Sequence, residues 1–560
     1  MTSNGRTQGQ KRETMTIARL LRQADGSPCP GIIALPAHLA DCAVTHIAHD
    51  SRLVRPGSLF FALVGQQSDG HDFAAKALAA GAVAVVAQKP LPLNGLPPHD
   101  SSLDKLILVD DSRIALACAA ASFYGNPGAE LAITGITGTN GKTTTIYLLD
   151  AIARAAGEQS AVIGTVESRY LLSADADAAE CVQSCETTTP DALQLQELLA
   201  QMRDAGVQSV AMEVSSHAID LHRVEQTPFA AVAFTNLSQD HLDYHHSMEA
   251  YRQVKERLFF DFETSARIVN TDDSTGAGLA EKLRATATAV ITVGICQSTA
   301  SDCKSCTSSN NCSKDIAASD LVLGTASSQF SLHTPDGSAQ INFPLVGRYN
   351  VENALLAAAC AWSRGISLSA IADGLSRAPQ VPGRLEQVQG EQDFSVFVDY
   401  AHTPDALATA LAALREQSSG RLITVFGCGG DRDASKRPLM GQAAAVGSDY
   451  VVVTSDNPRS EDPAGIVADI CKGLPADFSS SARKANLATI IDRREAIFHA
   501  VKQARSGDCI LIAGKGHEDY QIFADGTIAF DDREVAREAL LQRKGEQEAQ
   551  NHKTQGHSNV

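Results

Sequence analysis

Residues 131–145 read LAITGITGTNGKTTT, an apolar strand pattern that runs through a glycine-rich loop into a helical pattern. Glycines let backbone N–H groups approach phosphates, and the N-terminus of the following helix adds its dipole. Lys142 is placed to reach the terminal phosphates, and Thr143 to give a hydroxyl to Mg²⁺. The usual G-x-x-x-x-G-K-[ST] spacing is not met, because Ile136 stands where its first glycine would fall. The segment predicts a compact nucleotide-binding loop in an α/β domain.

The composition places this loop in a large, acidic chain. The 560 residues carry 47 Lys and Arg against 65 Asp and Glu, a formal net charge of −18. This charge argues against a general nucleic-acid binder, which needs a basic footprint. The sequence shows no secretory signal and no apolar run near the roughly 18 residues of a membrane span. Thirteen scattered cysteines are typical of reduced thiols. We therefore expect a cytoplasmic protein without membrane insertion.

Strand and helix patterns alternate along the chain, which is typical of α/β domains with mostly parallel sheets. We expect three domains, at residues 16–128, 129–378 and 379–540. Residues 1–15 and 541–560 are expected to be flexible tails. A Cys- and Ser-rich insertion interrupts the second domain at about 296–320. Cys296, Cys303, Cys306 and Cys312 allow a zinc knuckle there, but their irregular spacing favours a mobile surface loop.

Polar residues downstream of the loop complete a candidate metal site. Glu213 and His241 follow two predicted strands whose carboxyl ends point to the same sheet edge as the loop. A carboxylate oxygen and an imidazole nitrogen both suit a second metal position. Lys255 lies on an amphipathic helical pattern, where an arbitrary lysine would be a snorkelling surface residue. His245 and His246 are interpreted as surface residues.

The third domain carries polar clusters after four predicted strands, and their charges describe a ligand. The clusters begin at Asp399, Gly427, Ser455 and Gly514. Arg432 and Arg459 offer planar forks for carboxylates, whereas Asp456 and Glu518 suit ammonium groups. A ligand with two carboxylates and two amines fits this mixture better than one with a single carboxylate.

The segment TGTNGKTTT resembles the phosphate loop of the Mur ligase family, ATP-dependent enzymes that build the peptidoglycan stem peptide. Folylpolyglutamate synthetases share a related loop. The resemblance covers about residues 45–535, excluding the insertion. It implies an N-terminal α/β UDP-binding domain, a central P-loop-type ATPase domain with a mostly parallel sheet, and a C-terminal Rossmann-like domain. The Asp-Asn-Pro-Arg motif at 456–459 resembles that of the diaminopimelate-adding members, and the GKGHE segment at 514–518 matches as well.

The resemblance also assigns residues to ligands. It implies ATP contacts at Gly138, Thr139, Asn140, Gly141, Lys142, Thr143, Thr144, Asn350 and Asp399. Contacts to the UDP-sugar peptide are implied at Ser51, Gln66, Gln67, Ser68, Thr188, Thr189, Ser215 and Arg223. Diaminopimelate contacts are implied at Arg432, Asp456, Asn457, Pro458, Arg459, Gly514 and Glu518. The implied Mg²⁺ ligands are Thr143, Glu213, His241 and Lys255, the lysine in carbamylated form. Leu221, Gln66 and Ser68 depart from residues frequent in the family.

The reaction that follows is ATP-driven amide formation through an acyl phosphate. The resemblance implies addition of meso-2,6-diaminopimelate to UDP-N-acetylmuramoyl-L-alanyl-D-glutamate, with Lys142, Lys255, His241 and Arg384 as catalytic residues. Arg384 and Asp399 are equally compatible with packing at a hinge. A lysine-adding Mur ligase, a folylpolyglutamate-synthetase-like ligase and a non-catalytic nucleotide-binding regulator stay open as alternatives. We expect a monomer.

Overall fold

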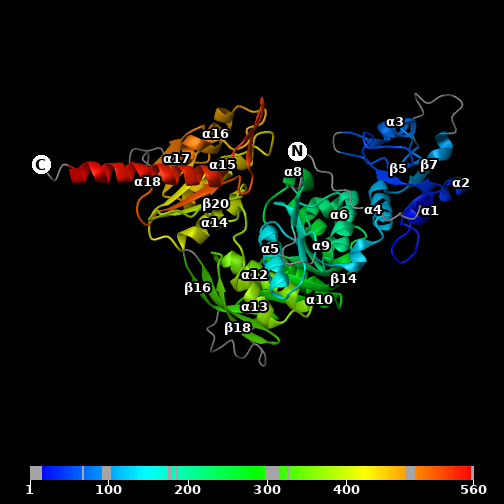
Figure 1. Ribbon diagram of the computed structural model, residues 1–560, viewed down its shortest axis with the longest axis horizontal. Coiled ribbons are helices and arrows are strands. Elements are labelled where there is room, and N and C mark those ends of the chain that lie inside the picture. The colour runs from blue at the N-terminus through cyan, green and yellow to red at the C-terminus, as the bar shows by residue number, and fades with distance from the viewer. Residues whose placement is uncertain are drawn as a thin grey trace. The chain divides into compact units, whose positions relative to one another are not determined.

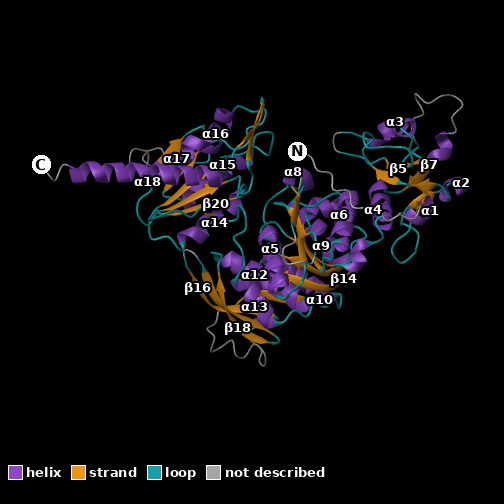
Figure 2. Cartoon of the chain, viewed as in Figure 1, coloured by secondary structure: helices purple, strands orange, loops and turns teal. Residues whose placement is uncertain are grey.

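The computed structural model describes residues 15–65, 68–90, 102–173, 179–183, 187–296, 314–324, 327–474 and 486–556. Helices and strands alternate along the chain, as Figures 1 and 2 show. The chain forms two compact units. Unit 1 comprises Met1–Gly135, Glu158–Ala230 and Val254–Ser265, and unit 2 comprises Ile136–Gly157, Ala231–Gln253 and Ala266–Val560. Among the described residues, no helix has the length and apolar character needed to cross a membrane.

The first part of unit 1 is a small α/β fold. Its five-stranded sheet has the order β2-β7-β6-β5-β4, in which only β2 is antiparallel to its neighbour. Its strands and helices are β1 (Met15–Thr16), α1 (Ile17–Leu20), β2 (Ile32–Ala34), α2 (Ala37–Ala40), β3 (Ala43–Val44), β4 (His46–Ala48), β5 (Ser58–Phe61), α3 (Ala74–Ala79), β6 (Ala84–Ala87), β7 (Leu106–Val109) and α4 (Ser112–Phe123). The predicted apolar runs of this region thus form the buried strands β5, β6 and β7.

The largest sheet has the order β11-β10-β9-β12-β8-β13-β14-β15-β16-β17-β18, and β8, β13 and β14 have residues in both units. Parallel pairing joins β9 to β12, β14 to β15, and β15 to β16. The elements are β8 (Ala132–Thr137), α5 (Lys142–Ala155), β9 (Ser160–Ile163), β10 (Ser168–Leu171), β11 (Glu180–Gln183), α6 (Ala192–Asp204), β12 (Ser209–Glu213), α7 (Ser216–Asp220), β13 (Phe229–Phe234), α8 (Leu242–His245), α9 (Met248–Phe260), β14 (Thr264–Asn270), α10 (Ser274–Ala285), β15 (Ile291–Ile295), β16 (Ile316–Leu323), β17 (Ser328–Thr334), β18 (Gly337–Phe343), α12 (Arg348–Ser363) and α13 (Leu368–Ser376).

Antiparallel strands extend this sheet at both ends. β10 and β11 pair antiparallel in unit 1, and β16, β17 and β18 form a meander in unit 2. The last strand of the meander, β18, alternates more and less buried residues, as expected where one face of a sheet is solvated. Most of the Cys-rich segment precedes it, but Cys303, Cys306 and Cys312 lie outside the described residues, so the structure does not test the predicted surface loop.

The C-terminal part of unit 2 is built on a six-stranded sheet with the order β19-β20-β24-β21-β22-β23. All neighbours pair parallel except β19 with β20. The elements are β19 (Glu386–Gln387), β20 (Ser395–Asp399), α14 (Pro404–Arg415), β21 (Leu422–Phe426), α15 (Lys436–Gly447), β22 (Tyr450–Val453), α16 (Pro463–Cys471), β23 (Leu487–Thr489), α17 (Arg493–Gln503), β24 (Cys509–Ala513), β25 (Tyr520–Phe523), β26 (Gly526–Ala529) and α18 (Asp532–Gly556). Insertion of β24 between β20 and β21 brings four strand ends to one edge.

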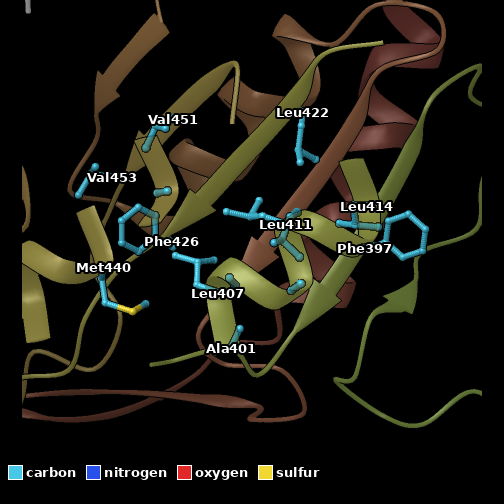
Figure 3. Packing of buried hydrophobic residues seen from close by; sticks show 14 of the residues in the cluster. Phe397, Ala401, Leu407, Leu411, Leu414, Leu422, Phe426, Met440, Val451 and Val453 are labelled. Carbon is cyan, nitrogen blue, oxygen red and sulfur yellow. The ribbon is translucent and has the colours of Figure 1, made fainter. Parts of the chain in front are cut away.

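Side chains alternate between two apolar cores across this sheet. Figure 3 shows one of them, in which Leu407 and Leu411 of α14 pack with Phe426 of β21. The other core joins the opposite strand residues, such as Val425 and Ile510, to α17 and α18. Two buried faces explain why these strands read as continuous apolar runs.

Helix α18 continues to Gly556, through residues for which the sequence predicts a polar tail. Residues 541–556 lack apolar periodicity but are rich in Lys, Glu, Gln and Arg, which have high helix propensity. The helix therefore extends beyond its last buried residues, Ala539 and Leu540.

Candidate active site

The phosphate loop in unit 2 connects β8 to α5 and is held by the segment after β13. The N–H of Thr139 donates to the Asn236 carbonyl at 2.9 Å, and that of Asn140 to Asn236 Oδ1 at 3.0 Å. Gly138 has φ +142°, and a Cβ there would lie 1.9 Å from Thr235 Oγ1, so only glycine fits. These contacts shape the predicted loop into a cradle with little room for side chains.

Lys142 and Thr143 begin α5, where backbone N–H groups suit an anion. Lys142 Nζ donates to the carbonyls of Gly138 and Thr139 at 2.9 and 2.8 Å, so the ammonium lies over the loop. Thr143 and Thr144 are buried. Asn353 on α12 abuts Gly141, while Asn350 donates to the Val346 carbonyl at 2.8 Å. The predicted ATP contacts from Gly138 to Thr144 thus span the loop and the first turn of α5 without a break.

Arg384 contacts this loop from the segment before β19. Its Nη2 donates to Thr143 Oγ1 at 3.0 Å, and its guanidinium lies 4.7 Å from the centroid of the Tyr400 ring. Arg384 Nε is buried and has no hydrogen-bond partner among the described residues. A buried guanidinium nitrogen without an acceptor favours an anionic ligand at this point.

Asp399, at the end of β20, has two backbone partners. Its carboxylate accepts hydrogen bonds from the N–H groups of Leu385 at 2.6 Å and Ala401 at 2.8 Å. Burial raises the pKa of the Asp399 carboxyl, against the opposing charge of Arg384. These bonds favour the hinge-packing alternative for Asp399, whereas Arg384 lies directly at the phosphate loop.

Unit 1 contains a second polar cluster at the ends of β9 and β12. Glu213 is buried, and its Oε1 accepts a hydrogen bond from the N–H of Thr165 at 2.8 Å. Thr165 Oγ1 lies 3.1 Å from both Glu213 Oε2 and Thr188 Oγ1. Thr165 follows β9 as Glu213 ends β12, so the strand-end rule applied to β9 would have identified it.

The predicted sugar-peptide contacts join this cluster. Thr189 Oγ1 donates to the Glu213 carbonyl at 2.9 Å, and the Ser215 N–H donates to Thr189 Oγ1 at 3.1 Å. Arg223 Nη1 donates to the Thr189 carbonyl at 2.8 Å. The structure thus brings together Thr188, Thr189, Ser215 and Arg223, which lie in two separate sequence segments.

The predicted metal ligands are divided between the units, with Glu213 and Lys255 in unit 1 and Thr143 and His241 in unit 2. Lys255 is 1% exposed, so it is not a snorkelling surface lysine. The described residues contain no group of three or more His, Cys, Asp or Glu arranged to hold a metal ion. Mg²⁺ seldom needs such a cage, because it keeps waters and binds substrate phosphates with one or two carboxylates. At the phosphate loop itself, Thr143 offers a hydroxyl oxygen of the kind that a nucleotide-linked Mg²⁺ takes.

His241 caps α8 with φ +53°, and its side chain is 44% exposed beside Asp240 at 3.3 Å. Burial alone would raise the pKa of Asp240, but the neighbouring imidazoles of His241 and His402 lower it. The interpretation of His245 as a surface residue is wrong, because it is 6% exposed with its ring 5.0 Å from that of Tyr251. Helix α8 contacts α9 through these two rings. The polar residues on either side of His245 give no sign of this contact in the sequence.

The C-terminal sheet brings the four predicted strand-end clusters together. The N–H of Gly514, after β24, donates to the Asp399 carbonyl at 3.0 Å, and that of Thr454 to the Phe426 carbonyl at 2.9 Å. The buried Arg493–Asp532 ion pair, at 2.7 Å, lies beneath them. Arg493 also donates to the carbonyls of Ser455 and Ala513, so it joins two of the strand ends.

The two predicted arginines flank Gly429, with Arg459 Nη1 and Arg432 Cγ within 3.0 and 3.7 Å of a Cβ built there. Arg459 Nη1 donates to the Gly430 carbonyl at 2.8 Å, while Arg432 is exposed. The segment is pinned by β25, because Ile522 N–H donates to Asn457 Oδ1 at 3.0 Å. Pro458 is buried within the same turn.

Asp456 and Glu518 form the acidic side of this cluster. Glu518 Oε2 accepts hydrogen bonds from Asn457 Nδ2 at 2.9 Å and from Lys515 Nζ at 3.2 Å. Burial raises the pKa of the Glu518 carboxyl, and the Lys515 ammonium opposes this shift. Lys515, which is completely buried, is absent from the predicted contacts although it stands within the GKGHE segment.

Fewer of the predicted UDP contacts are described. Ser51 is half-buried and Ser68 is exposed, whereas Gln66 and Gln67 lie outside the described residues. A contact that the sequence did not predict joins His49 Nε2 to Asp191 Oδ2 at 3.3 Å in unit 1. The Asp191 carboxylate also caps α6.

Three domain families of known proteins match the chain. The description "Mur ligase family, catalytic domain" matches residues 43–124, "Mur ligase middle domain" residues 136–361, and "Mur ligase, glutamate ligase domain" residues 383–516. The chain belongs to the Mur ligase family. The predicted fold class, α/β with three Mur ligase domains and a mostly parallel central sheet, is thereby confirmed.

Comparison with individual proteins narrows the similarity to one kind of Mur ligase. A protein of Syntrophomonas wolfei named UDP-N-acetylmuramoyl-L-alanyl-D-glutamate--2,6-diaminopimelate ligase is 44% identical over 503 residues, 89% of this chain and 95% of the relative. A solved structure of a ligase with the same name is 33% identical, with a TM-score of 0.62 over 91% of this chain and 98% of that one. The fold is also shared with a Thermotoga maritima MurF ligase in complex with ADP, 16% identical with a TM-score of 0.55 over 94% and 98% of the chains.

Proposed function

We propose that this protein is the ATP-dependent, ADP-forming ligase that joins 2,6-diaminopimelate to UDP-N-acetylmuramoyl-L-alanyl-D-glutamate in peptidoglycan precursor synthesis. The observation that carries the amino-acid specificity is the cluster at 456–459 and 514–518. The Arg459 guanidinium and the Asp456 and Glu518 carboxylates lie there at the carboxyl ends of β22 and β24, and Arg432 stands next to them on the segment after β21. The named relatives, with 44% and 33% identity, support the same reaction.

The alternatives fit this cluster less well. Lysine has one carboxylate, so a lysine-adding ligase would leave one of Arg432 and Arg459 without a partner. A folylpolyglutamate ligase gives no reason for the Asp-Asn-Pro-Arg motif. A non-catalytic regulator does not explain why a buried carboxylate and lysine, Glu213 and Lys255, accompany the phosphate loop.

In the proposed mechanism, the substrate carboxylate attacks the γ-phosphoryl group of ATP and gives an acyl phosphate and ADP. The diaminopimelate amine then attacks the acyl carbon, and phosphate leaves. The N–H groups of the 138–144 loop and the Lys142 ammonium hold the phosphates, and Arg384 binds oxygens near Thr143. The protein contributes mainly by positioning the reactants.

Mg²⁺ neutralises charge on the phosphoryl group when it is bound. We propose Thr143 as the residue that holds the ion next to ATP, and Glu213, His241 and carbamylated Lys255 for a second position. Diaminopimelate would be oriented by Arg432 and Arg459 through its carboxylates and by Asp456 and Glu518 through an ammonium, with Asn457, Pro458 and Gly514 shaping the pocket. The UDP-sugar peptide would contact Ser51, Ser68 and the Thr188–Arg223 cluster.

Domain limits at 16–128, 129–378 and 379–540 belong to the same proposal, as does action as a monomer. The cytoplasm is the proposed compartment, because the reaction consumes ATP.

The test is phosphate release by the purified protein with ATP, Mg²⁺ and the UDP-muramoyl dipeptide. Diaminopimelate, lysine and ornithine are supplied in separate reactions. We expect turnover with diaminopimelate. Turnover with lysine but not with diaminopimelate would refute the specificity, and no amino-acid-dependent turnover would favour the regulator.

A further inference from the structure

Lys515 lies at the centre of the acidic cluster and is completely buried. Its Nζ is 3.0 Å from Asn457 Oδ1, 3.2 Å from Glu518 Oε2 and 3.4 Å from Asp456 Oδ1. It also lies 5.5 Å from the centroid of the Tyr520 ring. An ammonium has three donors, and here three side-chain oxygens surround it.

These contacts leave one oxygen of each carboxylate for a ligand. Asp456 Oδ2 and Glu518 Oε1 accept no hydrogen bond within the described part of the chain. Both side chains keep some solvent exposure, 11% for Asp456 and 16% for Glu518, whereas that of Lys515 has none. Lys515 is therefore enclosed by protein groups, and the carboxylates face the ligand side.

The net charge of Asp456, Glu518 and Lys515 suits the binding of one ligand ammonium. Two carboxylates and one ammonium leave a single negative charge, which matches a single ligand ammonium. Without Lys515, two largely buried carboxylates would share one site, and one of them would take up a proton. A protonated carboxyl attracts the ligand ammonium less strongly than a carboxylate does.

We propose that Lys515 is a positioning residue for amino-acid selection, which keeps Asp456 and Glu518 ionised and oriented so that together they bind one ammonium group of the incoming diamino acid. Lys515 itself touches no substrate. This inference rests on the proposed function and adds a residue that none of the predicted contacts includes.

The experiment compares wild-type enzyme with Lys515→Met, which removes the charge and keeps an unbranched side chain. We expect the KM for diaminopimelate to rise by about tenfold or more at neutral pH, while the KM values for ATP and for the UDP-dipeptide stay within about twofold. Loss of the ammonium raises the pKa of the Glu518 carboxyl further, so the defect should be largest at low pH. Measured as the ratio to wild type at the same pH, the defect should shrink as pH rises from about 6.5 to 8, because ionisation of the ligand amine affects both enzymes alike.

Lys472→Met is the matched control, because Lys472 forms an exposed ion pair with Asp469 at 2.6 Å in the same sheet domain. Its kinetics should equal those of the wild type. Lys515→Arg keeps the charge in a planar fork, so its KM for diaminopimelate should rise less than in Lys515→Met and show no added pH dependence. If Lys515→Met does not fold, as judged by circular dichroism, Lys515→Gln replaces it with the same expected pH dependence.

Different results would overturn the proposed function and the role of Lys515. Wild-type protein without diaminopimelate-dependent phosphate release would overturn the proposed function before any variant is compared. With an active wild type, three results would overturn the role of Lys515: an unchanged KM for diaminopimelate, an equal rise in the KM for ATP, or a defect independent of pH.

Discussion

Arg459 offers the sharpest test of how the ligand is recognised. Its Nη1 is committed to the carbonyls of Gly430 at 2.8 Å and Asn457 at 3.4 Å, so the protein fixes the guanidinium in place. Nε and Nη2 make no hydrogen bond within the described residues and can hold a carboxylate in a fork. Arg459→Ala should therefore remove a preorganised carboxylate contact and leave the phosphate loop unchanged.

The expected magnitude follows from those two donors. Each hydrogen bond to a charged group contributes about 1.5–3 kcal/mol, so two of them give at least about 3 kcal/mol. At 1.4 kcal/mol per factor of ten, the KM for diaminopimelate should rise roughly 100-fold. Arg432 is exposed, and solvent screening should limit the effect of Arg432→Ala to about fivefold.

The assay is phosphate release under varied diaminopimelate, ATP and lysine concentrations. Because the lost contact serves a carboxylate that lysine lacks, Arg459→Ala should reduce the kcat/KM preference for diaminopimelate over lysine by about the same factor. Arg459 has φ +53°, so Arg459→Asn, which tolerates this conformation, checks that backbone strain is not the cause. Arg415→Ala, at an exposed pair with Asp449, is the matched control. Equal rises in KM for ATP and diaminopimelate, or an unchanged preference over lysine, would refute the reasoning.

Three further predictions concern stability and the nucleotide. Asp532→Ala leaves the Arg493 guanidinium buried without its carboxylate, and the free energy of unfolding should fall by about 3–5 kcal/mol in urea titrations; a loss below about 1 kcal/mol would contradict this. Gly138→Ala forces a Cβ onto Thr235 Oγ1 and should abolish ATP binding in calorimetry, whereas Gly157→Ala, with open space around it, should bind normally. Asp191 raises the pKa of His49, so their ion pair stabilises the fold below the ordinary histidine pKa of about 6.5, and this stabilisation is lost as pH rises through the raised value. Asp191→Asn keeps a helix cap and should lower the unfolding free energy more at about pH 6 than at pH 8; equal losses would exclude the linkage.

Residues at the ends of parallel strands were the most predictable from the sequence. Glu213, Asp456 and Gly514 each follow an apolar run, and a parallel sheet places such residues at one edge. Lys515 was missed because a lysine after a strand is normally a solvated residue. Its burial depends on Asp456, 59 positions away, which no local pattern reveals.

Other features depend on tertiary packing in the same way. His245 is polar with polar neighbours, yet its ring packs on Tyr251 because α8 lies against α9. The sequence is compatible with a hinge role and with a phosphate role for Arg384, and its contact with Thr143, 241 residues earlier in the chain, favours the phosphate role. The meander of β16 to β18 was not predicted, because its strands carry no site motif and only β18 alternates buried and exposed residues.

The backbone of Gly383 packs directly against Gly516 and His517, leaving no room for a side chain. The next residue, Arg384, reaches Thr143 in the phosphate loop, while the neighbours of Gly516 include Lys515 and Glu518 at the acidic cluster. The contact between Gly383 and Gly516 therefore joins the segment that reaches the phosphate loop to the segment that carries the acidic cluster. A side chain at either glycine would push these two segments apart, so both positions tie the geometry of the phosphate loop to that of the acidic cluster.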